Sequence, residues 1–571
     1  MASSLLDLAL NATLFIIPLI HLLLAPYSKV EESFNLQATH DILVYGVPVT
    51  NAKVQLSSTY DHFTFPGAVP RTFLGSVLLA GISQPIIALV GFAHAQFVVR
   101  ALLGCFNAVS LLLFRRALDR AFGKATGRWW VALIAGQFHL AFYLTRTLPN
   151  MYSFGLTTLA AALIIPQTKY SLPDQKKSVY LLVISAAIFR SETAILLATT
   201  CLHLLISKRI GLLALIQTGI VCSFTCLVVS IPLDSYFWQT VPMWPELAGF
   251  YFNAVLGSSS EWGVSAWHFY FSSALPRVLL NPVTFGLIAL AVFLPATRRQ
   301  ALDLTLPGLI FVAIYSIQPH KEARFIFYVI PSFTAAAALG ASYLSNRATK
   351  ATLYLAASAV VGLSVLACFA VSIGMLLLSS LNYPGGDAMN QLAALTSSTH
   401  DVSSNNPVRV HADVLTCMTG LTLFGQNPSG LPLAIGTPSR DILDSLPTKP
   451  LVLFDKNEDA DVLLKQSFWK QFDYVLAEDP SKVIGGHWKT LGVVQGYDGI
   501  EILRPGQTRK YDEDAESGRK YHVLGRGAVV AHLREMVRRV TRGWWVGPRM
   551  SPKIFILQQV QDGAAKAAAT M

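Results

Sequence analysis

Long apolar runs recur along the first two thirds of this chain and restrict its fold more than any other feature. A helix needs about 20 mostly apolar residues to cross the roughly 30 Å hydrocarbon layer of a bilayer. Eleven runs, two of them short, are candidates for such spans: residues 5–25, 94–114, 129–145, 151–166, 178–189, 193–206, 211–231, 278–295, 302–318, 325–344 and 351–380. Because 53% of the 571 residues are hydrophobic and only 13% are charged, the sequence predicts an all-α polytopic membrane protein.

The connections between these runs differ in charge, and the difference predicts how the chain is oriented. One alternating set, 115–128, 167–177, 207–210, 296–300 and 345–350, holds fourteen Lys and Arg in forty residues. The opposite set, 26–71, 146–150, 190–192, 232–277 and 319–324, holds eight in 106 residues. Cytoplasmic loops carry the excess of Lys and Arg, so the first set is predicted to be cytoplasmic and the second luminal. The apolar run 72–92 would break this alternation if it crossed, and we interpret it as a juxtamembrane or re-entrant helix.

Topology also accounts for the net charge of +11, so no nucleic-acid partner is predicted. The chain divides into a membrane domain, residues 1–386, with luminal loops 26–71 and 232–277, and a smaller luminal α/β domain, residues 387–505. The remainder, 506–571, is basic and irregular. Its amphipathic stretch around Val529–Val540 could meet acidic lipid headgroups, and a disordered tail is the alternative interpretation.

The first luminal loop holds an adjacent pair of carboxylates, Glu31 and Glu32, soon after the first span, and Asp61 and His62 follow later in the same loop. Glutamates in such a position can be helix caps or solvated charges. They can also act as a general base if they share a face with groups that bind a substrate.

A late luminal connection is unusually rich in ionisable residues, with His320, Lys321, Glu322 and Arg324 directly before Phe325. A structural interpretation pairs Glu322 with Arg324 or Lys321 at the membrane boundary. A functional interpretation assigns His320, Lys321 and Arg324 to a phosphate anion, because ammonium and guanidinium groups give it charge-assisted hydrogen bonds.

Isolated charges occur in two other luminal connections, at Arg146 and at Arg190 with Glu192. Such residues at a membrane boundary mark binding sites in many membrane proteins. Arg190 and Glu192 could equally be a buried structural ion pair.

At this point the sequence resembles a known family, the dolichol-phosphate-mannose-dependent mannosyltransferases of the endoplasmic reticulum, which have the GT-C membrane fold. The family's His-Lys-Glu-x-Arg-Phe box is matched by residues 320–325. The segments 30–41, 60–67, 146–150, 234–238, 244–246, 260–263 and 274–277 are similar to members that make an α-1,6 linkage. The resemblance is strong over about residues 1–385 and weakens afterwards.

The resemblance implies an inverting transfer of mannose from dolichyl-phosphate-mannose to the Man7GlcNAc2 lipid-linked oligosaccharide acceptor, on the luminal side of the endoplasmic reticulum membrane. Glu31 matches the position where sister enzymes usually carry Asp, and Glu32 matches its acidic partner. Our order of preference for the general base is therefore Glu31, then Glu32. His320, Lys321 and Arg324 would stabilise the leaving phosphate.

Further residues are substrate-binding candidates: Asp61, His62, Arg146, Arg190, Glu192, Glu261 and Trp262. We predict no cofactor and no essential metal, because a lipid-phosphate donor needs no nucleotide-sugar site and Asp459-Ala460-Asp461 lies in an acidic stretch of the tail. Two alternatives remain open. One is a sister mannosyltransferase that makes α-1,2 linkages or acts on glycosylphosphatidylinositol precursors, and the other is a lipid or sugar transporter.

Overall fold

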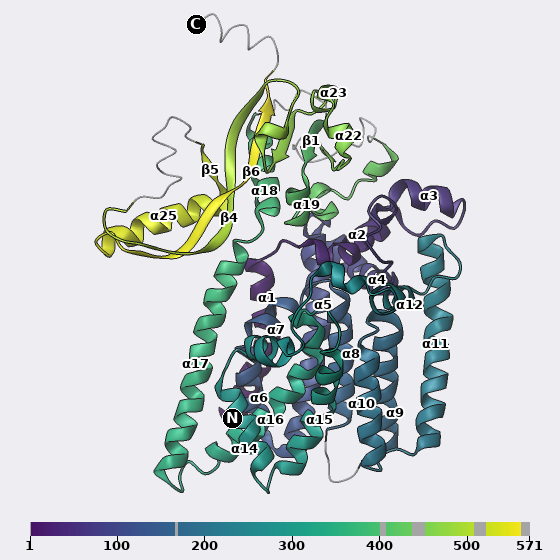
Figure 1. Cartoon of the computed structure of the whole chain (residues 1–571), viewed down its shortest axis with the longest axis vertical. Helices are drawn as coiled ribbons and strands as arrows, with labels where there is room; N and C mark the ends of the chain where they lie inside the picture. Colours follow the sequence, from purple (N-terminus) through teal and green to yellow (C-terminus); the bar gives the residue numbers. More distant parts are fainter. Residues whose placement is uncertain (1, 166–169, 400–406, 437–450, 508–520, 561–571) are drawn as a thin grey trace, which may run out of the picture. The chain divides into compact units, whose positions relative to one another are not determined.

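The computed structural model describes residues 2–165, 170–399, 407–436, 451–507 and 521–560 (Figure 1). The chain forms two compact units. The first consists of Met1–Leu24, Phe34–Val90 and Phe97–Leu376. The second consists of Ala25–Ser33, Gly91–Gln96 and Leu377–Met571, so two short segments of the N-terminal half belong to the C-terminal unit.

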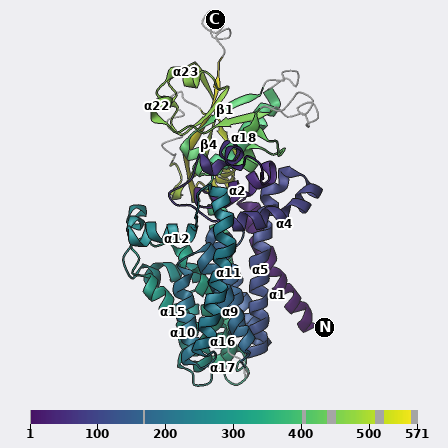
Figure 2. The ribbon, with the colours of Figure 1, turned by 90° about the vertical axis from the view of Figure 1, so that its right-hand side faces the viewer.

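Apolar helices build the first unit, and most run roughly parallel to one another (Figures 1 and 2). These helices are α1 (Ala2–Leu24), α5 (Ala95–Phe122), α6 (Lys124–Ala135), α7 (Phe138–Tyr143), α8 (Pro149–Leu163), α9 (Leu172–Ile184), α10 (Thr193–Ile206), α11 (Leu212–Trp238), α14 (Val283–Phe293), α15 (Arg298–Tyr315), α16 (Ile330–Ser345) and α17 (Thr352–Ser380). Every predicted span coincides with one of these helices or with a consecutive pair. Five helices in the described part are long and apolar enough to cross a membrane alone, and a bent pair, Tyr270–Leu279 with Val283–Phe293, is a sixth candidate.

Close packing in the middle of this unit depends on small side chains. Helix α16 is rich in alanine and is almost entirely buried, and it packs against α14. A Cβ atom on Gly340 of α16 would lie 2.4 Å from the carbonyl oxygen of Leu287 on α14. Only glycine therefore allows the two backbones to approach this closely, as small residues do at many membrane helix contacts.

The predicted luminal loops contain shorter helices: α2 (Val30–Tyr45) and α3 (Ala52–Thr59) in the first, and α12 (Pro245–Phe250) and the start of α13 (Leu275–Leu279) in the second. Helix α4 (Leu74–Val90) follows the first loop. Run 72–92 forms α4 as one uninterrupted helix of 17 residues despite Pro85. Its predicted juxtamembrane or re-entrant placement stays a prediction.

A buried carboxylate joins α4 to the end of α11. Asp234 of α11 is fully buried and accepts hydrogen bonds from the backbone N–H of Phe73 at 2.7 Å and from the hydroxyls of Thr72 and Ser230 at 3.0 and 2.8 Å. Because Phe73 directly precedes α4, Asp234 satisfies a donor that the helix itself leaves open.

The second unit contains a six-stranded mixed sheet in the order β2-β1-β3-β6-β4-β5. The strands are β1 (Val408–Ala412), β2 (Val452–Asp455), β3 (Tyr474–Ala477), β4 (Trp488–Leu503), β5 (Val523–Leu524) and β6 (Trp545–Gln559). β1 pairs in parallel with β2 and β3, whereas β6 is antiparallel to both β3 and β4. The smaller helices of this unit are α18 (Pro384–Thr399), α19 (Val414–Met418), α20 (Leu423–Gln426), α22 (Ala460–Leu463), α23 (Gln466–Trp469) and α25 (Gly525–Val540).

Helices cover both faces of this sheet. On one face Ala388 and Leu392 of α18 pack against the central strands. On the other, Phe468 and Trp469 of α23 pack with Phe472 over β3 and β6. The α/β architecture predicted for this part of the chain is therefore present, with its core between the sheet and these helices.

The sheet does not end at residue 505, where the sequence suggested that the domain gives way to a tail. Strand β6 lies in the interior of the sheet between β3 and β4, and α25 packs on β4 and β6. The apolar strand β6 was hidden because a basic, polar segment precedes it in sequence. Residues 508–520 and 561–571 of the predicted tail lie outside the described residues.

Asp234→Ala should lower the free energy of unfolding by about 3 kcal/mol, because the buried donors of Thr72, Phe73 and Ser230 lose their charged acceptor. Thermal unfolding of detergent-solubilised protein, followed by circular dichroism, measures the change. Asp174→Ala is the matched control, since the Asp174 side chain is 39% exposed and, within the described residues, forms an ion pair with exposed Lys177 at 3.5 Å. Equal stabilities of the two variants would contradict the assigned role of Asp234.

Candidate active site

The first turn of α2 holds the two carboxylates predicted as general-base candidates, and the structure separates them by environment. Glu32 is 2% exposed, and its Oε1 accepts a hydrogen bond from the backbone N–H of Lys29 at 2.9 Å. This is one half of a capping box, in which the third residue of a helix accepts the backbone N–H of the residue before the helix, here Lys29. Glu31 is exposed, and it makes no hydrogen bond or ion pair within the described residues. Of the two, Glu31 is therefore the carboxylate open to a substrate.

His62, in contrast, lies inside the packing of the first loop. Its ring contacts Phe73 and Trp238 with centroid separations of 4.8 Å each, and its Nε2 lies 3.0 Å from the carbonyl oxygen of Phe237. Burial lowers the pKa of His62 to about 4, so the ring is neutral near pH 7. The neighbouring residue Asp61 is half-buried, and its backbone N–H donates to buried Asp41 at 2.8 Å. Both predicted binding residues thus connect the loop to α2 and α11.

Arg146 also lies in the interior, at 3% exposure, with its guanidinium carbon 4.1 Å from the centre of the Phe142 ring. The carbonyl of the next residue, Thr147, accepts a hydrogen bond at 2.7 Å from Asn35 of α2. The connection 146–150 is therefore hydrogen-bonded to α2, the helix whose first turn contains the paired glutamates.

Glu192 lies at the start of α10 and receives donors from three separate parts of the chain. Arg190 donates from Nε at 2.8 Å, Tyr328 donates from its hydroxyl at 3.0 Å, and Asn150 of α8 donates from Nδ2 at 3.1 Å. These donors satisfy the buried carboxylate, and Arg190 and Glu192 form a buried ion pair. Their predicted contacts with a substrate stay predictions.

The charged side chains of the box at residues 320–325 have different partners. The Lys321 ammonium is directed to the backbone carbonyls of Gln318 at 2.6 Å and Ser265 at 3.0 Å, and it is also 3.5 Å from that of Pro319. It thus holds the loop 232–277 against the box. Burial lowers the pKa of Lys321.

The other charged members of the box surround Glu322. Its Oε1 accepts from Arg324 at 2.6 Å and lies 3.2 Å from Nε2 of His320. The ring of Phe325 lies beneath two guanidinium groups, Arg190 at 5.1 Å and Arg324 at 5.6 Å from its centre. These contacts bring two arginines together at the end of the helices, which suits recognition of an anion.

Glu261 and Trp262 are exposed in a short 3₁₀ turn, and their predicted substrate contacts remain predictions. The box restrains the residues that follow them. His320 Nδ1 lies 3.2 Å from the carbonyl oxygen of Gly263, and the N–H of Ser265 donates to Pro319 at 3.0 Å. The loop that carries Glu261 and Trp262 is therefore anchored beside the ionisable box.

Two further residues of this region were missed by the sequence analysis, Arg71 and Glu246. Glu246 lies in the first turn of α12 and accepts a hydrogen bond from the backbone N–H of Ser191 at 2.6 Å. Burial raises the pKa of Glu246 to about 8, and the attraction of Arg190 offsets only part of this effect.

Arg71 interacts electrostatically with Arg190, Arg324, Glu246 and Glu322. Burial and the two neighbouring arginines lower its pKa to about 10, so it stays protonated at neutral pH. Its guanidinium donates to no hydrogen-bond partner within the described residues. The isolation of Arg71 among the few basic residues of the first loop was the signal that could have identified it.

We name this group of six residues the charged junction: Arg71, Arg190, Glu192, Glu246, Glu322 and Arg324. With Glu246 protonated at neutral pH, its arginines carry more charge than its ionised carboxylates, so the junction has a positive excess. Such an excess favours an anion such as a phosphate. The junction lies in the first unit and the paired glutamates in the second.

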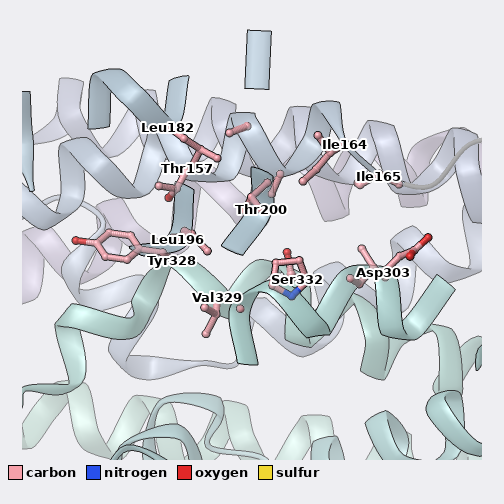
Figure 3. A pocket seen from close by; sticks show the side chains of 15 residues that line it. Thr157, Ile164, Ile165, Leu182, Leu196, Thr200, Asp303, Tyr328, Val329 and Ser332 are labelled. Atoms are coloured by element: carbon pink, nitrogen blue, oxygen red, sulfur yellow. The ribbon is translucent and has the colours of Figure 1, made fainter. Parts of the chain in front are cut away.

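A small cavity lies within the helices of the first unit, between α8, α9, α10, α15 and α16 (Figure 3). Tyr328, which binds Glu192, lies at one end of it, and Asp303 lies at the other. Its volume of about 50 Å³ admits water but no sugar ring. The cavity is therefore no candidate for a carbohydrate site.

No group of three or more His, Cys, Asp or Glu side chains with metal-binding geometry occurs within the described residues. Asp459, from the Asp-Ala-Asp sequence, caps α22 by accepting the backbone N–H of Asp461 at 2.9 Å.

Comparisons with known proteins agree with this architecture. Residues 11–418 match the Alg9-like mannosyltransferase family. The chain is 32% identical to the Saccharomyces cerevisiae Dol-P-Man:Man(7)GlcNAc(2)-PP-Dol alpha-1,6-mannosyltransferase, over 86% of this chain and 88% of the yeast protein. It is 35% identical to a probable enzyme of the same name from Schizosaccharomyces pombe, over 80% and 74% of the two chains. ArnT from Cupriavidus metallidurans bound to undecaprenyl phosphate has a similar fold, with a TM-score of 0.51, 14% identity, and coverage of 83% of this chain and 92% of ArnT.

Lys321→Met should release the loop that the ammonium holds, because the carbonyls of Ser265 and Gln318 lose their common donor. We expect chymotrypsin to cleave after exposed Trp262 or Trp267 about tenfold faster, which corresponds to about 1.4 kcal/mol of lost restraint. Mass spectrometry of timed digests measures the rate. Lys177→Met, which changes an exposed lysine, should leave cleavage unchanged, and an unchanged rate in Lys321→Met would show that other contacts hold the loop.

Proposed function

The chain belongs to the Alg9-like mannosyltransferase family, and on this premise we propose that it is an α-1,6-mannosyltransferase of lipid-linked oligosaccharide assembly. The donor is dolichyl-phosphate-mannose and the acceptor is Man7GlcNAc2-diphosphodolichol. The match over nearly the full length of both chains to the budding-yeast enzyme carries this assignment. We place the protein in the endoplasmic reticulum membrane with its active site on the luminal side, in keeping with the Lys and Arg distribution of its loops.

The reaction requires a base for the attacking hydroxyl, and we assign this role to Glu31. The acceptor's 6-hydroxyl attacks the anomeric carbon of the mannose while a carboxylate removes its proton, since an alcohol is too weakly acidic to ionise first. The bond from the anomeric carbon to the phosphate oxygen breaks, and inversion converts the β-linked donor into an α-linked product. Exposure of the Glu31 carboxylate supports this role, whereas Glu32 is occupied as a helix cap.

The leaving group is dolichyl phosphate, whose charge grows as the bond breaks. We assign its stabilisation to the arginines of the charged junction, chiefly Arg324 and Arg71. Arg71 supports this assignment because its guanidinium donates to no hydrogen-bond partner within the described residues. His320 and Lys321 remain proposed phosphate ligands, although in this structure the Lys321 ammonium faces backbone carbonyls. Arginines that the fold already holds in place, as in the charged junction, stabilise developing negative charge without having to rearrange during the reaction.

An assay with membranes, dolichyl-phosphate-mannose and the heptamannosyl acceptor tests both the function and the base. Wild type should add one α-1,6-linked mannose, identified by linkage-specific mannosidase digestion. Glu31→Gln should reduce kcat/KM about 10²–10⁴-fold, because the amide cannot accept the proton. Glu32→Gln should retain activity within about tenfold and keep its stability, because the amide oxygen can still accept the hydrogen bond from the backbone N–H of Lys29.

Each other outcome has a definite meaning. An α-1,2-linked product or transfer only to a glycosylphosphatidylinositol precursor would assign the chain to a sister activity. Transbilayer movement of the lipid without transfer would favour a transporter. Full activity in both Glu31→Gln and Glu32→Gln would exclude the proposed base.

The pH dependence of donor binding should follow the ionisation of Glu246. As pH rises through about 8, Glu246 ionises beside Arg71 and Arg190, removes the positive excess and weakens phosphate binding. The KM for the donor should rise about fivefold between pH 7 and pH 9, corresponding to about 1 kcal/mol of lost attraction. Glu246→Gln should lose most of this rise, whereas Glu478→Gln, at an exposed residue of the sheet domain, should keep it. Identical pH profiles in wild type and Glu246→Gln would contradict the role of Glu246.

A further inference from the structure

The second unit extends beyond its six-stranded sheet as a two-stranded ribbon. The ribbon consists of residues 497–503 of β4 paired with residues 545–550 of β6, beyond the point where β5 joins the sheet at Val493 and Val494. Helix α25 packs along both strands (Figure 1).

The outer face of this ribbon is apolar, although no described element covers it. Ile500, Ile502 and Val546 are 52%, 63% and 67% exposed, and Ile502 is directly opposite Val546 in the register. Trp544, next to the strand, is 47% exposed, whereas Trp545 on the inner face is 4% exposed. A strand pair with one buried face normally carries polar residues on the other face. The outer face of the ribbon breaks this rule.

Helix α25 adds a second apolar surface beside the first. Val529, Leu533, Met536 and Val540 are exposed at spacings of four, three and four residues, which places them in one stripe. At about 100° per residue, the stripe lies about a quarter turn from the half-buried side that includes Val530, Arg534 and Val537. The polar residues His532, Glu535 and Arg539 lie on the side opposite the half-buried one. The stripe therefore adjoins the ribbon instead of facing away from it.

Both parts of this element are tied to the end of a membrane span. The N–H of Tyr497 donates to the carbonyl of Leu381 at 3.1 Å, and the guanidinium of Arg526 donates to the carbonyl of Ser380. Ser380 is the last residue of α17, a helix of 29 residues with the hydropathy of a membrane span. The ribbon and α25 thus begin where this helix ends, which is where a membrane span would reach the lipid headgroups.

The charges of the element suit the same environment. Arg504, Arg539 and Arg542 are exposed near the turns that join the ribbon and α25, and the acids of the described ribbon and α25 are Asp498, Glu501 and Glu535. Arginine forms bidentate bonds with phosphate, and tryptophan prefers the interface between headgroups and hydrocarbon. An apolar surface flanked by arginine and tryptophan has the composition of interfacial membrane segments.

We propose that the ribbon and α25 form an interfacial anchor, which lays the apolar stripe and the ribbon's outer face on the bilayer surface and directs its arginines to lipid phosphates. The anchor holds the sheet domain at the membrane independently of α17. This role does not depend on the proposed transferase reaction. It requires only a lipid surface, and no protein partner.

Lipid photolabelling of the full chain tests the proposal. The purified protein is reconstituted in nanodiscs of phosphatidylcholine and phosphatidylserine that contain a phosphatidylcholine with a diazirine near the top of one acyl chain. Illumination and peptide mass spectrometry then locate the adducts. Adducts are expected on the peptides that contain Ile502 and Leu533 and on α17, and none on the peptide that contains Leu464, which is 72% exposed elsewhere in the same unit.

Matched variants separate insertion from incidental labelling. The double variant Ile502→Asp/Leu533→Asp should lower labelling of the ribbon and α25 at least fivefold, while Leu464→Asp leaves it unchanged. Because these positions are exposed, the substitutions should not affect folding, and unchanged labelling of α17 verifies this. Labelling of α17 without labelling at Ile502, or without labelling at Leu533, overturns the proposal, as does equal labelling at Leu464.

Discussion

The carboxylate of Glu192 joins parts of the chain that are far apart in sequence, and the charged end of the helical unit depends on it. A carboxylate buried inside the protein has no water to bond with, so Glu192 at the start of α10 must find its donors within the protein. Arg190, Tyr328 and Asn150 supply them, and in doing so they connect α8, α10 and the segment that follows the ionisable box. Arg190 then lies over the Phe325 ring, close to Arg324.

This arrangement explains why so many charges are found together at one end of an apolar helical body. Some of them are structural: Glu192 is satisfied, and the Lys321 ammonium holds a loop through backbone carbonyls. The Arg71 guanidinium donates no hydrogen bond to the part of the chain that the structure describes, and burial raises the pKa of Glu246 to about 8, which leaves it mostly uncharged at neutral pH. The positive excess that results is a property of the whole group, because it depends on which carboxylates are ionised and which arginines are paired.

The sheet domain follows a different physical rule. Its core forms by burying apolar side chains between the sheet and α18 on one face and α23 on the other. The ribbon and α25 are the exception, since they leave apolar residues exposed on two adjoining surfaces. Their hydrogen bonds to Ser380 and Leu381, at the end of α17, support the proposed reason for this exception, which is contact with lipid.

Much of the fold followed from the sequence alone. All the predicted spans coincide with helices, because hydrophobic periodicity is a local property. The ionisable box was likewise visible, since charge between apolar runs is conspicuous. The sequence could not assign β6 to the interior of the sheet, identify Arg71 and Glu246, or distinguish an exposed Glu31 from a capping Glu32. Those features depend on hydrogen bonds and burial among residues distant in the chain, and only the tertiary structure decides which charges are paired and which stay available.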